Sequence, residues 1–405
     1  MITITGGTYQ EQCLLPDFNM KFGSGLRACH AIHALDKNTV IEFHTFSSKE
    51  NELFLDMFEA AYKIKTHKYP AADSIGFYYD YPLRTPIIYP RPDLITRADD
   101  IVFEADHILC FGMLEGNACV KGKKVVYDPQ SPVCPKSFSK TKSQADELAI
   151  VINFKEAQKI SQKKTVEDIR NYFFDIEKVD VLVIKMGPKG AMVYTANDQT
   201  VIPVYKTGAV WPIGSGDVFA AIFAYHWMEG GRSAIEAANS ASFSTAIYCN
   251  SRNFRFEYAE DQQNIEPIQI REFPAGQVYL AGPFFTFSQK WLINEVLNNL
   301  THLGMKVFSP LHEVGLGEPG SDVAKKDLDG LDQCTIVFAI LDGLDSGTLV
   351  EIGYALKMGI PVIAYVENET NENLTMLVGT GCTIEKDLTT ALYKCLWLLA
   401  ESENA

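Results

Sequence analysis

The feature that most constrains the fold is the alternation of short apolar, β-prone runs with stretches that carry apolar residues at helical spacing. The helical pattern is clearest after Gly216 and after Ser233, where the sequence is rich in alanine. Such alternation is typical of a mostly parallel sheet with helices on its faces, so the sequence predicts an α/β fold. The β-prone runs include residues 39–43, 107–111, 124–127, 149–152, 181–184 and 191–194.

A second series of the same kind follows a polar segment. Residues 257–275 are acidic and polar at first and are punctuated by Pro267 and Pro274, which favours a linker. We therefore expect one domain over residues 1–256 and another over 276–405. The second has about five short strands, which favours a small flavodoxin-like, Rossmann-type parallel sheet. Its β-prone runs are 277–281, 306–308, 336–341 and 361–366, and its helical patterns cover 288–303, 327–334, the residues after 348, and 388–399.

Two aromatic runs, residues 75–81 and 85–89, interrupt the first series. They are β-prone and are joined by a short polar turn. They are expected to form either a hairpin that projects from the main sheet, as a lid does, or two further strands of the core or edge.

Composition limits the classes of partner. A chain of 405 residues can bury two cores, but its net charge of −15 argues against binding to a nucleic acid backbone. Nucleosides and nucleotides, held by local groups, remain suitable ligands. No apolar run is long enough to span a membrane, and the first seven residues lack a signal-peptide pattern. Nine scattered cysteines without a C-x-x-C pair predict reduced thiols in core positions and a cytoplasmic protein.

An acidic turn near the C-terminus carries the strongest functional signal. The apolar run 335–340 leads into a turn with Asp342 and Asp345, and Glu351 follows in what we expect to be the first turn of a helix. Ligands bind at the carboxyl ends of parallel strands, and a Glu kept ionised by the helix dipole can attack a sugar carbon. The alternative is structural, because Thr348-x-x-Glu351 also reads as a capping box and Asp residues form turns.

Residues 277–382 resemble the nucleoside 2-deoxyribosyltransferase family. The resemblance implies that Glu351 forms a covalent deoxyribosyl intermediate without a cofactor, and that Asp327 orients the base and shuttles its proton. The motifs that carry it are Tyr279-Leu280-Ala281-Gly282-Pro283-Phe284-Phe285, Asp327, Asp345-Ser346-Gly347-Thr348-x-x-Glu351-Ile352-Gly353-Tyr354-Ala355 and Asn373-Leu374-Thr375-Met376.

The same resemblance assigns the substrate contacts. Tyr279 and Gly282 belong to the first strand and substrate loop, and Asp345 would bind the sugar 5′-hydroxyl. A carboxylate there repels a 5′-phosphate, whereas related nucleotide hydrolases carry a Ser, so we expect nucleosides as substrates. The segment around Asn373 reaches into a neighbouring subunit's site in the family, which implies a homo-oligomer.

A second candidate site lies at Gly214-Ser215-Gly216-Asp217. Two glycines let backbone N–H groups surround an anion at a helix N-terminus, and Asp217 can take a proton from an attacking hydroxyl. The alternative is an Asp N-cap that follows a glycine turn.

Residues 1–255 resemble the PfkB (ribokinase-like) sugar kinase family. The resemblance implies a ribokinase-like α/β sandwich with a small β lid, the use of ATP and Mg²⁺, and Asp217 as the catalytic base. The motifs are Gly214-Ser215-Gly216-Asp217, Lys185-Met186-Gly187-Pro188-Lys189-Gly190-Ala191, Asn153-Phe154-Lys155-Glu156 and Gly23-Ser24-Gly25. The residues thereby assigned to phosphate or ATP are Gly214, Ser215, Gly216, Asn153, Glu156 and Gly187, with Glu156 holding magnesium through water and Gly25 near the sugar.

Four departures from this family's pattern fall around the sugar. Trp211 replaces the Asp that usually begins the glycine signature, and Cys29 replaces an Asn. Glu11 takes the place of the early sugar-binding Asp, and Tyr9 replaces an Asn. The domain is therefore either a kinase with a changed substrate, such as a nucleoside, or a degenerate kinase that only binds.

Together, the two resemblances predict a bifunctional enzyme of nucleoside metabolism. Its C-terminal domain would cleave or transfer the 2-deoxyribosyl group, and its N-terminal domain would phosphorylate a sugar or nucleoside. One alternative is a nucleoside N-glycoside hydrolase with a nucleotide-sensing pseudokinase, which could deplete nucleotides in defence. Another is a sensor that binds nucleotides without turning them over.

Overall fold

The computed structural model describes residues 1–131, 133–256, 265–270, 275–315 and 322–402. It divides into two compact units, each with its own sheet and core. The first comprises Met1–Thr207 and Trp211–Pro267, and the second comprises Gly208–Val210 and Ile268–Ala405. Most of the predicted linker, 257–275, lies outside the described residues.

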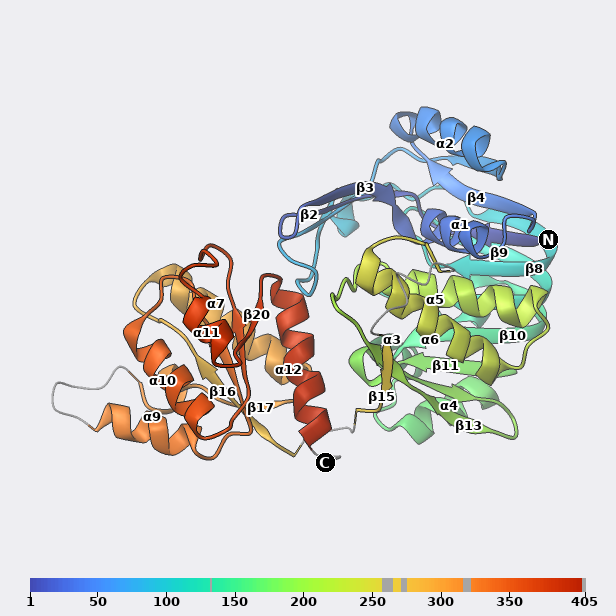
Figure 1. Cartoon of the computed structure of the whole chain (residues 1–405). Helices are drawn as coiled ribbons and strands as arrows, with labels where there is room; N and C mark the ends of the chain where they lie inside the picture. Colours follow the sequence, from blue (N-terminus) through green and yellow to red (C-terminus); the bar gives the residue numbers. More distant parts are fainter. Residues whose placement is uncertain (132, 257–264, 271–274, 316–321, 403–405) are drawn as a thin grey trace. The chain divides into compact units, whose positions relative to one another are not determined.

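The first unit is built on a nine-stranded sheet, coloured blue to green in Figure 1. Its order is β13-β12-β11-β10-β9-β8-β1-β4-β5, and all neighbours pair in parallel except β11–β12 and β12–β13. The strands are β1 (Ile2–Thr5), β4 (Ile41–Ser47), β5 (Lys65–Pro70), β8 (Ile101–Phe111), β9 (Ala118–Asp128), β10 (Gln144–Asn153), β11 (Val181–Lys185), β12 (Ala191–Tyr194) and β13 (Gln199–Ile202).

Helices cover both faces of this sheet, as the alternating pattern predicts. Along β10, Ala149 and Val151 enter the core beneath α1, α2, α5 and α6, while Ile150 and Ile152 enter the core beneath α3 and α4. The helices are α1 (Gly23–Leu35), α2 (Lys49–Tyr62), α3 (Phe154–Ser161), α4 (Val166–Asp175), α5 (Ser215–Ala224) and α6 (Ala234–Ser251); a two-stranded sheet of β14 (Val204–Lys206) and β15 (Glu266–Ile268) is separate.

A four-stranded sheet, which we call the lid sheet, is separate from the main one. Its order is β3 (Phe18–Phe22), β2 (Tyr9–Cys13), β6 (Gly76–Tyr79) and β7 (Ile87–Tyr89), and β2 and β3 project beyond the main sheet in Figure 1. The antiparallel β6–β7 pair is the predicted aromatic hairpin. The prediction of a small lid is therefore confirmed, and the alternative of two more main-sheet strands is wrong.

The connection between β8 and β9 is short for a parallel pair. Such pairs are ordinarily joined by a crossover of a dozen or more residues, but here residues 112–117 make the connection. This loop carries Glu115, whose Oε2 accepts a hydrogen bond of 2.8 Å from the Tyr9 hydroxyl. The loop thus binds the lid sheet to the main sheet.

The second unit is a five-stranded, all-parallel sheet in the order β17-β16-β18-β19-β20. Numbered along the chain this is 2-1-3-4-5, the flavodoxin-like order that the sequence predicts. Helices α7 and α12 contact one another and the sheet, while α10 contacts both the sheet and α9. The elements are β16 (Gln277–Ala281), α7 (Phe287–His302), β17 (Lys306–Phe308), α8 (Pro310–Glu313), α9 (Val323–Leu331), β18 (Ile336–Ile340), α10 (Ser346–Lys357), β19 (Val362–Tyr365), α11 (Thr375–Gly379), β20 (Thr383–Glu385) and α12 (Leu388–Ser402).

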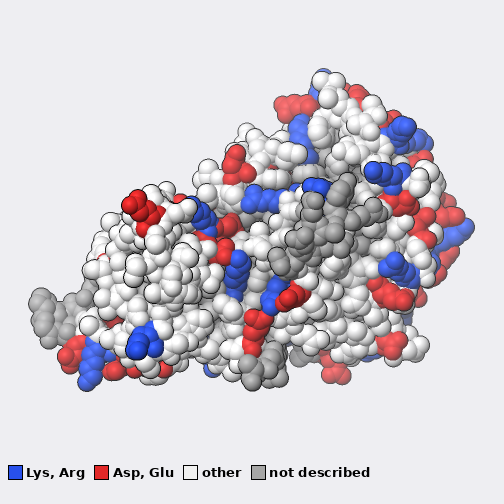
Figure 2. Space-filling view, viewed as in Figure 1, with Lys and Arg blue, Asp and Glu red and all other residues white. Residues whose placement is uncertain are grey.

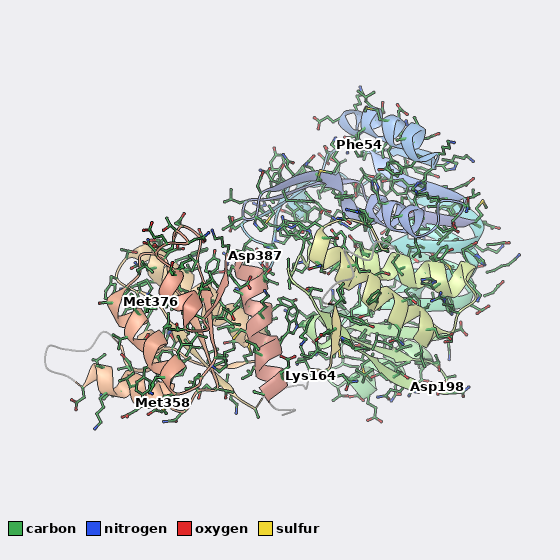
Figure 3. The ribbon with its side chains drawn as sticks, viewed as in Figure 1. Phe54, Lys164, Asp198, Met358, Met376 and Asp387 are labelled. Atoms are coloured by element: carbon green, nitrogen blue, oxygen red, sulfur yellow. The ribbon has the colours of Figure 1, made fainter. Side chains whose placement is uncertain are left out.

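A polar side chain marks the start of the last helix. Asp387, labelled in Figure 3, accepts a 2.7 Å hydrogen bond from Thr390 N just before α12 begins.

The surface carries charges of both signs. Acidic and basic side chains are interspersed on the face shown in Figure 2. Within the described ranges, no helix is long and apolar enough to cross a membrane.

All nine cysteines are free thiols, as predicted. Six are buried, and Cys119 and Cys249 are partly buried. Cys134 is exposed, so the expectation that every cysteine is a core residue is wrong for this one.

Candidate functional site

The start of α10 organises the C-terminal site. Asp345 caps this helix, because its Oδ2 accepts hydrogen bonds from Thr348 N at 2.9 Å and from Thr348 Oγ1 at 3.1 Å. The predicted capping box of Thr348 and Glu351 is therefore wrong. Since α10 begins at Ser346, Glu351 lies in its second turn, and the prediction that it occupies the first turn is wrong as well.

Glu351 points into the interior, where it meets a tyrosine from the sheet. The fully buried Tyr279 on β16 donates a 2.7 Å hydrogen bond from its hydroxyl to Glu351 Oε1. Burial raises the pKa of Glu351 to about 7; the Tyr279 hydrogen bond opposes this, and the charges of Asp327 and Asp345 add to it. Burial thus opposes the ionisation of this carboxylate that the helix dipole is expected to favour.

Asp327 on α9 belongs to the same group of carboxylates. Its Oδ1 is shielded from solvent and has no hydrogen-bond partner among the described residues. Burial raises the pKa of this carboxyl. A buried oxygen without a partner is uncommon in folded proteins and is suited to a ligand that supplies the missing hydrogen bond. The fold thus brings together the four residues Tyr279, Asp327, Asp345 and Glu351.

Gly282 and Asn373 have different surroundings. Gly282 directly follows β16, and a Cβ there would lie 3.0 Å from Ile293 Cδ1 and 3.0 Å from Ile340 Cβ, so the close approach of β18 favours glycine. Asn373 is exposed before α11, and its Nδ2 donates to Glu369 Oε2 at 2.8 Å.

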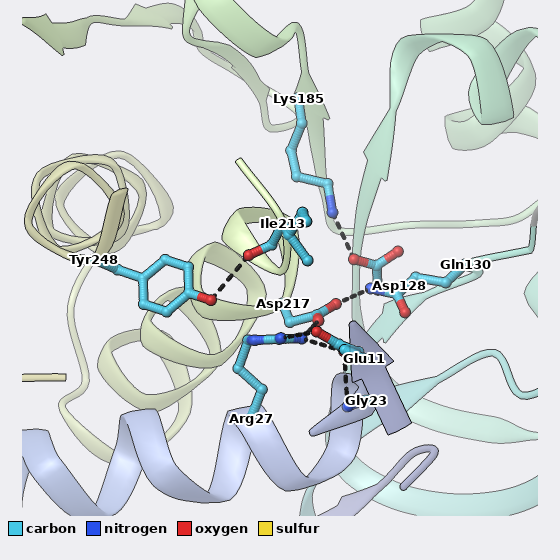
Figure 4. Close-up of polar contacts among 9 residues, drawn as sticks. All are labelled: Glu11, Gly23, Arg27, Asp128, Gln130, Lys185, Ile213, Asp217 and Tyr248. Carbon is cyan, nitrogen blue, oxygen red and sulfur yellow. Dashed lines mark hydrogen bonds and ion pairs between the residues drawn. The ribbon is translucent and has the colours of Figure 1, made fainter. Parts of the chain in front are cut away.

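The N-terminal site is dominated by a residue that sequence reasoning missed. Arg27 on α1 is only 1% exposed, and its Nη1 donates to Asp217 Oδ2 at 2.7 Å and to Glu11 Oε1 at 3.0 Å. Its Nη2 pairs with Glu11 Oε2. Glu11 also accepts from Gly23 N at 2.9 Å, and Gln130 Nε2 donates to Asp217 Oδ1 (Figure 4).

These contacts occupy both carboxylates to which the sequence assigns a role. Each oxygen of Asp217 accepts a hydrogen bond, one from Arg27 and one from Gln130. The guanidinium also packs against the glycine turn, since a Cβ on Gly214 would lie 2.1 Å from Arg27 Nε. Gly214, at φ 75°, is the N-cap of α5, so the alternative in which Asp217 is the N-cap is wrong. The sequence did contain one sign that Arg27 is buried and paired: it is a single Arg among small and apolar residues at the start of a helix.

A buried ion pair lies in the part of this site that the sequence assigns to phosphate, which we call the phosphate end. Lys185 Nζ donates to Asp128 Oδ2 at 2.6 Å, and it would lie 3.3 Å from a Cβ on Gly216. Asp128 is fully buried, and its Oδ1 has no hydrogen-bond partner within the part of the chain that the structure describes. Burial raises the pKa of Asp128, the charge of Lys185 opposes this, and the charge of Glu156 adds to it. The Lys185 cation beside Gly216 suits a phosphate, and the unpartnered oxygen of Asp128 suits the metal ion that accompanies it.

The remaining predicted residues form turns and helix starts around this pair. Asn153 caps α3 by accepting from Glu156 N at 2.9 Å, while Glu156 accepts from Asn153 N and from Ser131 N, both at 3.4 Å. Ser215 opens α5, and Gly187 adopts φ 57° after β11. Gly25 has a packing role, because a Cβ there would lie 2.5 Å from Phe43 Cε2.

A cavity of about 590 Å³ lies in the first unit. Phe111 and Gly112, at the end of β8, line it together with Pro129 and Gln130, which follow β9. Gln130 links this cavity to Asp217. Its polar lining includes the cationic side chains of Arg97 and Lys136, and Cys134 opens onto it.

Comparisons with known proteins identify both regions. Residues 278–389 match the family described as nucleoside 2-deoxyribosyltransferase, and residues 117–257 match the pfkB family carbohydrate kinase. A search of curated proteins finds no match.

Solved structures similar to the first unit share little sequence identity with the chain. Ribokinase from Thermotoga maritima is 18% identical, with 66% of this chain and 96% of that chain covered and a TM-score of 0.45. Ribokinase from Giardia lamblia is 14% identical, with 64% and 97% covered and a TM-score of 0.48. Fructokinase from Vibrio cholerae O395, in its fructose, ADP and calcium ion bound form, is 14% identical, with 63% and 95% covered and a TM-score of 0.47.

The main sheet and its lid sheet give the first unit the predicted ribokinase-like α/β fold, and the second unit has the predicted Rossmann-type parallel sheet. Each family match falls in the unit for which the sequence resemblance predicts it. The chain therefore joins a region that matches the pfkB carbohydrate kinase family to one that matches the nucleoside 2-deoxyribosyltransferase family.

Proposed function

We propose that the C-terminal unit cleaves the N-glycosidic bond of 2′-deoxynucleosides, with Glu351 as the nucleophile. The observation that carries the proposal is the 2.7 Å hydrogen bond from the buried Tyr279 to Glu351, with Asp327 and Asp345 close enough to affect the pKa of Glu351. This group lies within the segment that matches the deoxyribosyltransferase family.

The chemistry follows from these carboxyl groups. The ionised Glu351 attacks C1′, the bond from C1′ to the base nitrogen breaks, and its electron pair leaves with the base. Asp327, whose pKa is raised by burial, takes up a proton before this step and gives it to the departing base. A second base or water then attacks C1′ and releases Glu351, and the proton lost by that acceptor returns to Asp327.

Tyr279 acts as a positioning residue. Because its hydroxyl holds Oε1 of Glu351, Oε2 is left to face the sugar. The hydrogen bond also lowers the pKa of Glu351 against the effect of burial, so a larger fraction of the nucleophile is ionised at neutral pH.

Asp345 is proposed to select the 5′ end of the substrate. One of its oxygens caps α10, which leaves the other to accept a hydrogen bond from a 5′-hydroxyl. A 5′-phosphate at this position would meet a like charge, so nucleosides are favoured over nucleotides.

For the N-terminal unit there are two candidate functions. The first is an ATP- and magnesium-dependent kinase in which Asp217 is the base. The second is nucleotide binding without phosphate transfer. The contacts of Arg27 favour the second, because a carboxylate with both oxygens engaged is poorly placed to take a substrate proton. Nucleotide binding itself is supported by the phosphate end, where Lys185 suits phosphate and Asp128 and Glu156 suit Mg²⁺.

We also propose that the C-terminal unit functions in a homo-oligomer. Phe285 and Phe287 are 68% and 87% exposed, and Met376 on α11, labelled in Figure 3, is 76% exposed. Large exposed apolar side chains near a site are typical of surfaces that bind another chain. Asn373 precedes α11 and would approach a partner's site.

The first prediction concerns the nucleophile. Glu351→Gln is expected to reduce base release from deoxynucleosides at least ~10³-fold, because the amide cannot form the covalent intermediate. Chromatography of released base gives the rate, and transfer between two bases without free deoxyribose distinguishes transfer from hydrolysis. The exposed Glu372→Gln is the matched control and should keep full activity. Base release that persists in Glu351→Gln would refute the proposal.

The second prediction concerns pH. Since the nucleophile must be ionised and burial raises the pKa of Glu351 to about 7, kcat/KM should fall as the pH drops through 7. A hydrogen bond to a charged group contributes ~1.5 kcal/mol or more, so Tyr279→Phe should move this fall up by about one pH unit. Tyr354 lies on the same helix as Glu351, and its hydroxyl donates to Asp332. Tyr354→Phe should therefore leave the pH profile unmoved. An unmoved profile in Tyr279→Phe would contradict the positioning role.

The third prediction concerns the substrate. Wild-type protein should prefer deoxynucleosides to their 5′-monophosphates, and Asp345→Ser should shift that ratio toward monophosphates by about tenfold, because the negative charge is lost. Serine is itself a good N-cap, so α10 should keep its start, as should the second variant Asp345→Asn. Competition assays with paired substrates measure the ratio. A wild-type preference for monophosphates would show that the assignment of Asp345 is wrong.

The fourth prediction concerns the N-terminal unit. With ATP, Mg²⁺ and a panel of sugars and nucleosides, wild-type protein should form no more phosphorylated product than Asp217→Asn, while calorimetry should still detect ATP–Mg²⁺ binding. Mass spectrometry identifies the products. A phosphorylated sugar or nucleoside that Asp217→Asn fails to produce would establish the kinase instead, with Arg27 moving aside during turnover.

A further inference from the structure

Two histidines and a glutamate converge on one face of the main sheet, and none of them belongs to the sites described above. Strands β4 and β5 pair in parallel with Glu42 opposite Lys65 and His44 opposite His67, so these four side chains share a face. One nitrogen of each imidazole and one carboxylate oxygen of Glu42 all lie within 4.8 Å of one another. His67 Nε2 lies 3.5 Å from Glu42 Oε2.

The surroundings hold these rings in place. The ring of His44, which is 5% exposed, stacks between those of His67 and Phe103, with centroids 4.2 Å and 4.1 Å away. The hydroxyl of Tyr69 lies 3.0 Å from His44 Nδ1, in the position of an outer partner that fixes the orientation of a metal-bound imidazole. Phe103 comes from β8, so packing against a third strand keeps the ring oriented.

The bonding and exposure of the group suit a metal ion. Nε2 of His67 is shielded from solvent, and no hydrogen bond reaches it within the described ranges. The side chains of Glu42 and His67 are 27% and 33% exposed, which leaves a path for an ion from solvent.

We propose that Glu42, His44 and His67 form a binding site for a divalent transition-metal ion, with zinc as the best match. Two imidazoles and one carboxylate are a common zinc ligand set, and a water completes the tetrahedron. Ligand atoms around zinc lie ~3.3 Å apart, so modest side-chain rotations close the present spacing. Lys65, which lies 3.1 Å from Glu42 Oε1, is 62% exposed and can turn into solvent when the ion enters.

The test uses the full-length protein after dialysis against a chelator. Calorimetric titration with Zn²⁺ should give one equivalent that depends on this cluster, and Co²⁺ should give the intense visible absorption of a tetrahedral site. His67→Gln and Glu42→Gln should each weaken zinc binding at least ~10-fold, in line with the loss of a ligand. Both side chains are partly exposed, and circular dichroism checks that the variants fold.

Two matched controls locate the site. His107→Gln removes a histidine of similar exposure that pairs with Glu229, and Cys134→Ser removes an exposed thiol that could bind zinc elsewhere. Neither should change the affinity. Absence of zinc binding by the wild-type protein, unchanged binding in both His67→Gln and Glu42→Gln, or loss of binding in Cys134→Ser would each overturn the proposal.

Discussion

The buried guanidinium of Arg27 is the interaction on which the first unit most depends. It connects α1 to the lid sheet through Glu11 and to α5 through Asp217. Removing a charge from water is costly, and two carboxylates at hydrogen-bond distance offset that cost. The same pairing that joins these elements engages the carboxylate with which a kinase would act, so stability and catalysis compete for one group.

The carboxylates of the C-terminal unit have the opposite kind of neighbour. Burial is the main cause that raises the pKa of Glu351, and the negative charges of Asp327 and Asp345 add to its effect. Carboxyl groups kept near neutral pKa values by burial are typical of sites that move protons or attack substrates. In the first unit Arg27 neutralises the acidic cluster, and in the second unit burial raises the pKa of the proposed nucleophile, Glu351. This contrast is the physical basis for assigning the chemistry to the C-terminal unit.

Much of the fold could be predicted because its signals are local. The run 191–194 is β12 itself, and Ser233 caps α6 where the alanine-rich pattern begins. Helix α10 was harder, because Asp345 and Thr348 are both good caps, and only the hydrogen bond from Thr348 N to Asp345 Oδ2 decides between them. Because the helix is capped by Asp345, three residues before Thr348, Glu351 lies in the second turn and not in the first. The helix dipole is therefore not the main influence on its charge.

Patterns in the sequence were enough to predict two α/β units, to offer the lid hairpin as one of two possibilities, and to identify Glu351, Asp327, Asp345 and Asp217 as the residues of interest. The charge and pairing of these side chains depend on the tertiary structure. Tyr279 and Glu351 are 72 residues apart, and Arg27 and Asp217 are 190 apart. Burial and charge pairing arise from neighbours that are distant along the chain, so a local pattern identifies a carboxylate but cannot tell whether it is free, paired or protonated.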